Sequence, residues 1–110
     1  MIRDTISEIE ARLKNAGSLT DDSRRELTEL LAKLKTEITE LARTDADRAT
    51  SIAGFAQAST HEATRSEKNP QLLQLSIDGL SASVDGFEES HPQLVQLVNR
   101  ICTTLANLGI

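Results

Sequence analysis

Apolar side chains recur every three or four residues along most of this chain, which is the spacing of one face of an α-helix. The first run predicts a helix over residues 2–16, with Ile2, Ile6, Ile9 and Leu13 on one face. A second run predicts a helix over 20–43, and its apolar positions repeat as a heptad at Leu27, Leu31, Leu34, Ile38 and Leu41, with Leu30 beside them. Heptads are typical of helices that pack in bundles and coiled coils.

The pattern weakens at Thr44, and two interpretations remain open. Thr44 and Asp47 have the spacing of a capping pair, which would begin a separate helix. Alternatively, the second helix continues through a bend or short break to about residue 64, with a thinner, alanine-rich apolar face at Ala49, Ile52, Ala56 and Ala63. We favour the second interpretation. Residues 44–68 are the least hydrophobic stretch, so a linker or partial disorder is a further alternative, above all over 59–68.

The last two predicted helices, over 69–88 and 91–108, begin with two similar segments, NPQLLQL and HPQLVQL. Asn69 can cap the first of them, and Ser90 with Gln93 has capping-box spacing in the second. Proline follows each start at a position where its missing N–H costs little. Gly109 is expected to end the last helix. The apolar positions are Leu73, Ile77, Leu80, Val84 and Phe87, then Leu94, Val98, Ile101, Leu105 and Leu108, broadened by Val95, Leu97 and Cys102.

Gly79, Ser83 and Gly86 form a stripe of small side chains beside the apolar face of the 69–88 helix. Glycine inside a helix costs roughly 1 kcal/mol relative to alanine. The stripe therefore indicates a close helix crossing, unless the glycines are merely tolerated near a fraying helix end.

Together these patterns predict one all-α domain over 1–110, an antiparallel bundle of three to five helices with coiled-coil-like heptad seams. The hairpin of the last two helices is expected to pack on the 20–43 helix. The first two helices carry more apolar surface than one small bundle needs. We therefore expect a homo-oligomer, most simply a two-fold dimer.

Composition narrows the class of partner. The formal net charge is -5, and the only aromatic residues are Phe55 and Phe87. Nucleic acid is therefore not expected, since its binding needs basic surface and stacking side chains. Cys102 is the single cysteine, interpreted as a small buried hydrophobe rather than a reactive thiol. No signal peptide or membrane span is evident, which favours a cytoplasmic protein.

One pair of residues resembles a chemical site. Glu88 and His91 have the E-x-x-H spacing of di-iron helix bundles. However, His61 has Ala58 three residues before it, so there is no second copy, and the pair runs into Pro92. The structural alternative is a tight turn in which His91 bonds to the end of the preceding helix. We predict no catalytic, cofactor-binding or metal-binding residue and no small-molecule substrate.

The chain resembles a known family at both ends. Phe87-Glu88-Glu89-Ser90-His91-Pro92 and the closing Leu105-Ala106-Asn107-Leu108-Gly109-Ile110 are similar to the FE-x-x-HP segment and LAN-x-GI helix that end a family of short bacterial proteins of unknown function. The stretch SLTDDSRRELTELLAKL looks like the N-terminal half of that family. Residues 44–68 lie outside the resemblance, as an insertion would. The resemblance implies a helical architecture and no particular activity, cofactor or partner.

These observations favour a non-catalytic helical interaction or scaffold protein that self-associates or binds a protein partner. The first alternative is a peripheral membrane-surface protein using the amphipathic helix 93–110, although Arg100 is the only basic residue there. The second alternative, ranked last, is a metal-binding enzyme using Glu88 and His91.

Overall fold

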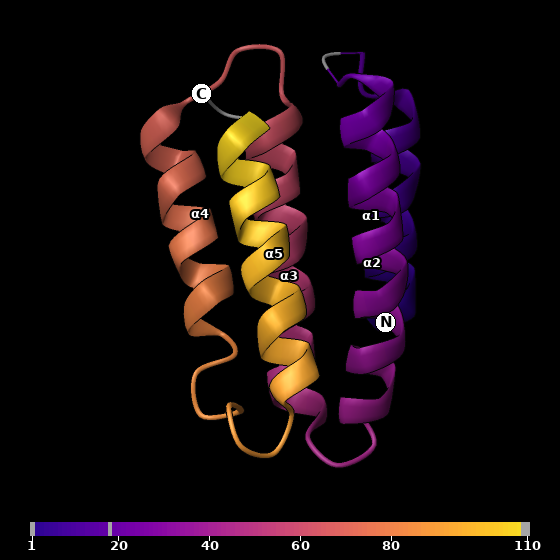
Figure 1. Cartoon of the computed structure of the whole chain (residues 1–110), viewed down its shortest axis with the longest axis vertical. Helices are drawn as coiled ribbons and strands as arrows, with labels where there is room; N and C mark the ends of the chain where they lie inside the picture. The colour runs from indigo at the N-terminus through magenta and orange to yellow at the C-terminus, as the bar shows by residue number, and fades with distance from the viewer. Residues whose placement is uncertain (1, 18, 109–110) are drawn as a thin grey trace.

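Five helices make up the computed structural model of the chain, which describes residues 2–17 and 19–108 and, of residue 3, the backbone only. They are α1 (Ile2–Asn15), α2 (Asp21–Leu41), α3 (Ala46–Thr64), α4 (Pro70–Ala82) and α5 (Pro92–Leu108). No strand occurs within the described ranges, so the all-α prediction is confirmed. The helices run along the long axis of a body of 37 × 24 × 21 Å (Figure 1). Gly109, expected to end the last helix, lies outside the described residues.

Side-chain caps explain where two of the helices begin. The Thr20 hydroxyl oxygen accepts a hydrogen bond of 3.1 Å from the Ser23 N–H at the start of α2. The Asn69 side-chain oxygen accepts from the N–H groups of Gln71 and Leu72 at the start of α4. Each cap satisfies donors that have no partner inside the helix. The chain is thereby fixed at the points where consecutive helices reverse direction.

The chain reverses between α2 and α3, and our preference for a helix continuing through a bend was wrong. α2 ends at Leu41, and α3 begins at Ala46 and packs back against α2. The new cap is Asp45, whose carboxylate accepts the Arg48 N–H at 3.1 Å. Thr44 does not cap α3, because its hydroxyl donates to the Leu41 carbonyl. Residues 46–64 are thus a separate helix rather than a linker or disordered stretch.

α3 is the central helix of the bundle. It contacts α1, α2, α4 and α5, whereas among the described residues α1 contacts only α2 and α3, and α4 contacts only α3 and α5. In Figure 1, α3 lies behind α5, and both lie between α4 and the α1–α2 pair. Its buried side chains are mostly small: Ala49, Ile52, Ala53, Ala56, Ser59, Thr60 and Ala63. Small side chains allow helix axes to approach closely, which is what a helix surrounded by four others requires.

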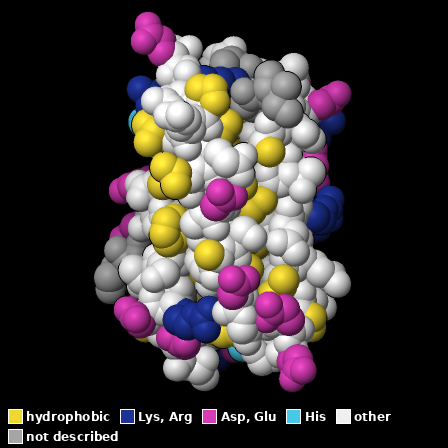
Figure 2. Space-filling model, turned by 90° about the vertical axis from the view of Figure 1, so that its left-hand side faces the viewer, with side chains coloured by type: hydrophobic (Ala, Val, Ile, Leu, Met, Phe, Trp, Pro, Cys, Tyr) yellow, Lys and Arg dark blue, Asp and Glu magenta, His cyan; other side chains and the backbone are white. Residues whose placement is uncertain are grey.

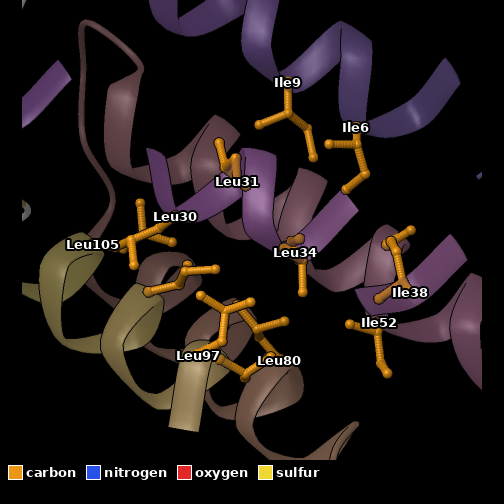
Figure 3. Close-up of a cluster of buried hydrophobic side chains, with 14 of the residues drawn as sticks. Ile6, Ile9, Leu30, Leu31, Leu34, Ile38, Ile52, Leu80, Leu97 and Leu105 are labelled. Atoms are coloured by element: carbon orange, nitrogen blue, oxygen red, sulfur yellow. The ribbon is translucent and has the colours of Figure 1, made fainter. Parts of the chain in front are cut away.

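The apolar faces of all five helices meet in one core. Figure 3 shows side chains from each helix converging, among them Ile6, Leu34, Ile52, Leu80 and Leu97. The faces of α1 and α2 that we expected to remain exposed are in fact buried within the single chain: Ile6, Ile9, Leu13, Leu27, Leu31, Leu34, Ile38 and Leu41 are at most 2% exposed. Those two helices therefore give no argument for an oligomer.

The hairpin of α4 and α5 also packs differently from our expectation, since α5 contacts α2 but α4 does not.

The expected 69–88 helix ends at Ala82, and the chain reaches α5 through successive turns. Val84 and Phe87 are nevertheless buried. Their spacing in the sequence continues the helical pattern, although the helix has ended before them. The predicted close approach occurs at Gly79, where an added Cβ would overlap the ring of Phe55 on α3. Gly86 is not part of it: its φ of +94° places it in a turn, where glycine is favoured for its backbone freedom.

Replacing Ala56 with leucine tests the central position of α3. Ala56 is fully buried, so three added carbon atoms must displace neighbouring helices. We expect the free energy of unfolding to fall by about 1–3 kcal/mol, measured by thermal and denaturant melting. Ala58→Leu is the matched control, because Ala58 is exposed on the same helix and the change should be nearly neutral. Equal stability of the two variants would contradict the packing described here.

Replacing Gly86 with alanine tests the turn. A side chain at positive φ costs about 1–2 kcal/mol, so the melting temperature should fall by several degrees. Gly54→Ala is the contrasting change, since Gly54 lies inside α3 and its added Cβ would meet nothing within 4 Å. That variant should gain up to about 1 kcal/mol from helix propensity. A Gly86→Ala protein as stable as the parent would place Gly86 in a helical conformation instead.

Candidate functional site

Glu88 and His91 lie in the connection between α4 and α5, and their side chains have separate partners. The Glu88 carboxylate accepts the Gly86 N–H at 2.8 Å. The His91 ring nitrogen Nδ1 lies 2.9 Å from the Ser90 hydroxyl oxygen, and the ring stands edge-on to Phe87. Within the described residues, no three His, Cys, Asp or Glu side chains are grouped as metal ligands would be. The pair therefore has the geometry of a structured turn.

Arg48 is the side chain that orders this connection, a role that the sequence pattern did not predict. Its guanidinium lies 4.1 Å from the centre of the Phe87 ring, a cation–π arrangement. It also donates to the backbone carbonyls of Ser83 and Asp85. These carbonyls follow the end of α4, where the helix dipole favours a cation. Arg48 thus ties the start of α3 to the far end of α4.

A groove between α1 and α3 contains two shallow hollows, of about 390 and 540 Å³. Gly54 and Gln57 line both hollows. Polar side chains bridge the groove from one helix to the other: Gln57 donates to Glu8 at 3.2 Å, and Arg12 to the Thr64 hydroxyl at 3.4 Å. These polar groups bond to one another across the groove instead of converging on one point. These hydrogen bonds are typical of the contact between two packed helices, whereas a ligand pocket has a few polar groups that converge on one point.

Cys102 on α5 is half-buried and lies against α4. Its thiol points toward the Ile77 carbonyl oxygen, at 3.8 Å from the sulfur. Burial, and then the nearby Asp78 carboxylate, raise the pKa of this thiol from 9.0 to about 11. Both causes disfavour the thiolate, which is the reactive form.

The apolar face of α5 is covered within the bundle. Its buried residues are Leu94, Leu97, Val98, Ile101 and Leu105, and the helix contacts α2, α3 and α4. Across the part of the chain that is described, none of the helices combines the length and apolar character needed for a membrane crossing.

Among the described residues, three large hydrophobic side chains are exposed, and they share one surface. Leu72 and Leu75 on α4 are 42% and 66% exposed, and Phe55 on α3 is 41% exposed. Leu72, Leu75 and Gly79 are spaced by three and four residues, so they follow one side of α4, and the Phe55 ring lies over Gly79. We call Phe55, Leu72 and Leu75 the α3–α4 apolar face. Figure 2 views the molecule from the α4 side, where apolar side chains form a broken column.

The α4 part of this face is almost free of charge. Asp78 is the only charged residue in the sequence of α4, and the Gln74 amide donates to it at 2.8 Å. The sequence offered a weak signal for this surface, because Leu72 and Leu75 lie beside the 73–77–80 apolar face. Only the orientation of α4 shows that these two leucines face outward.

A family model described as a domain of unknown function (DUF4404) matches residues 2–110 of the chain. The match agrees with the resemblance to a family of unknown function, and it spans residues 44–68 as well as the two ends. Neither the curated proteins nor the solved structures contain a significant match to the chain.

The environment of Cys102 predicts slow reaction with thiol reagents. At pH 8 a pKa of about 11 in place of 9.0 leaves roughly a hundredfold less thiolate. The greater nucleophilicity of a more basic thiolate offsets up to about tenfold of this. We therefore expect a disulfide reagent to react at least about tenfold more slowly with the folded protein than with the chain unfolded in denaturant. Equal rates would show that the thiol is not shielded.

Proposed function

The chain belongs to the DUF4404 family, and we propose that it is a non-catalytic helical interaction protein that self-associates through its α3–α4 apolar face. The observation that carries the proposal is the exposure of Phe55, Leu72 and Leu75 on one surface of an otherwise well-buried set of large hydrophobic residues. Removing apolar surface from water contributes roughly 25 cal/mol per Å², so covering this face is favourable.

A second copy of the chain is the partner that best fits the charge of this surface. A strongly basic partner would find only Asp78 on α4 to pair with. An acidic partner, nucleic acid included, would meet a molecule of net charge -5. A second copy presents the same nearly uncharged face, so the two faces can meet without opposing many like charges. Isologous pairing of this kind is the commonest form of oligomer.

The size of the face supports a weak dimer rather than an obligate one. A 13-residue helix such as α4 is about 20 Å long and about 10 Å wide. Even with Phe55 added, this surface is smaller than the roughly 800 Å² per partner of a standard interface. The buried core is complete within one chain, so the monomer folds without its partner. From these two features we expect reversible association with a dissociation constant in the micromolar range or weaker.

The alternative functions have less support. A metal-dependent enzyme at Glu88 and His91 would need those side chains to leave their present partners and gain further ligands. A membrane-surface role for residues 93–110 would require the apolar face of α5 to leave the core. Self-association requires neither change, because its proposed surface is already exposed.

Light scattering across a dilution series tests the proposal. At high protein concentration the mean mass should rise from 12.0 kDa toward twice that value, and it should return to the monomer on dilution. The mass should respond reversibly, because the interface is small and apolar. A mass of 12.0 kDa at every concentration up to about millimolar would contradict self-association.

A further inference from the structure

We infer that two copies pair with their α4 helices antiparallel, about a two-fold axis that passes beside Leu75. This inference rests on the proposed self-association and adds the geometry of the interface. The order of exposed residues along α4 sets the position of the axis, and the position of the single charge on this helix sets the orientation.

Leu75 is the natural centre of the interface. It is the most exposed of the three large apolar residues and lies between Leu72 on one side and the Phe55–Gly79 contact on the other. In a two-fold interface, a residue beside the axis meets the same residue of the other copy. Leu75 would therefore pack against Leu75 of the second copy, and the flanking apolar groups would lie at either end.

Antiparallel pairing matches apolar groups with one another. With Leu75 at the axis, the residue four positions after Leu75 on one helix lies level with the residue four positions before Leu75 on the other. Position 79, covered by Phe55, is then level with position 71 of the second copy, next to Leu72. Each Phe55 ring would thus cover the Leu72 of the other copy. A parallel arrangement would instead place each of these residues against itself.

Asp78 decides between the two orientations. In the antiparallel pair, Asp78 is level with Leu72 of the second copy, and the two aspartates are six residues apart along the helix direction. At 1.5 Å per residue this separates them by about 9 Å. In a parallel pair the two carboxylates would lie at the same level, where like charges repel most strongly. The antiparallel pair also leaves each Asp78 bonded to its own Gln74.

Opposite charges at position 75 test where the axis lies. Leu75→Glu and Leu75→Lys should each remain at 12.0 kDa across the dilution series, because two like charges would meet at the axis. An equal mixture of the two variants should regain a mass near twice 12.0 kDa, because glutamate would face lysine. Ala32→Glu is the control: it adds a charge on an exposed position of α2, which does not contact α4, and should associate as the parent does.

Lysine and glutamate at position 72 test the orientation. In the antiparallel pair a lysine at 72 is level with Asp78 of the second copy, so Leu72→Lys should associate more tightly than Leu72→Glu, by about tenfold for each of the two symmetry-related ion pairs. In a parallel pair position 72 faces itself, and both variants would lose association equally. Circular dichroism should show parental helicity in all variants, since these side chains are largely outside the core.

The outcomes separate the two proposals. A parent protein that stays monomeric overturns both self-association and this geometry. A parent that dimerises while Leu75→Glu alone also dimerises overturns the geometry and leaves self-association standing. Failure of the mixed Leu75 variants to associate, or equal loss for both Leu72 variants, likewise rejects the antiparallel pair.

Discussion

The whole bundle depends on the close packing of four helices around α3. The side of α3 that faces these helices has no room for rows of leucine, and its buried positions are accordingly alanine, serine and threonine with a single isoleucine. The Ser59 hydroxyl is satisfied by the carbonyls of its own helix, at Phe55 and Ala56. The Thr60 hydroxyl, also buried, meets no hydrogen-bond partner among the described residues. A buried hydroxyl without a partner costs about 1–3 kcal/mol.

The same arrangement determines which surfaces remain open. The outer helices α1 and α4 each touch only two others, so each has a wide side facing outward. On α1 that side is polar or bridged to α3, through contacts such as Glu8 with Gln57. On α4 it carries Leu72 and Leu75. The cation–π contact of Arg48 with Phe87 fixes the connection that follows α4 and so contributes to the direction in which these leucines point.

The sequence predicted the parts of the fold that rest on large side chains and on caps. Heptads located α1, α2 and α5, and Asn69 with Pro70 located the start of α4. It left a separate helix after Thr44 as the less favoured of two interpretations. The cap of that helix was placed one residue early, because a T-x-x-D pair and a capping aspartate one residue later look alike in sequence. It placed the end of α4 too late, because Val84 and Phe87 keep helical spacing in a turn. The sequence does not reveal the central role of α3, because low hydrophobicity is typical both of a weakly packed segment and of a helix packed through alanine. The α3–α4 apolar face depends on how α4 is rotated, which no spacing in one helix reveals.

The position of α3 in the middle of the chain also bears on how the protein reaches its structure. Each helix packs against the next one in sequence, so most of the core joins segments that are only a short loop apart. The contacts of α2 with α5 and of α1 with α3 are the main exceptions. Chains with mostly local contacts lose little entropy in closing loops before their apolar side chains are buried. Helical bundles rich in local contacts fold in microseconds to milliseconds. A helix flanked on both sides by its neighbours in sequence can serve as a common template, onto which the preceding and following hairpins dock without waiting for distant parts of the chain.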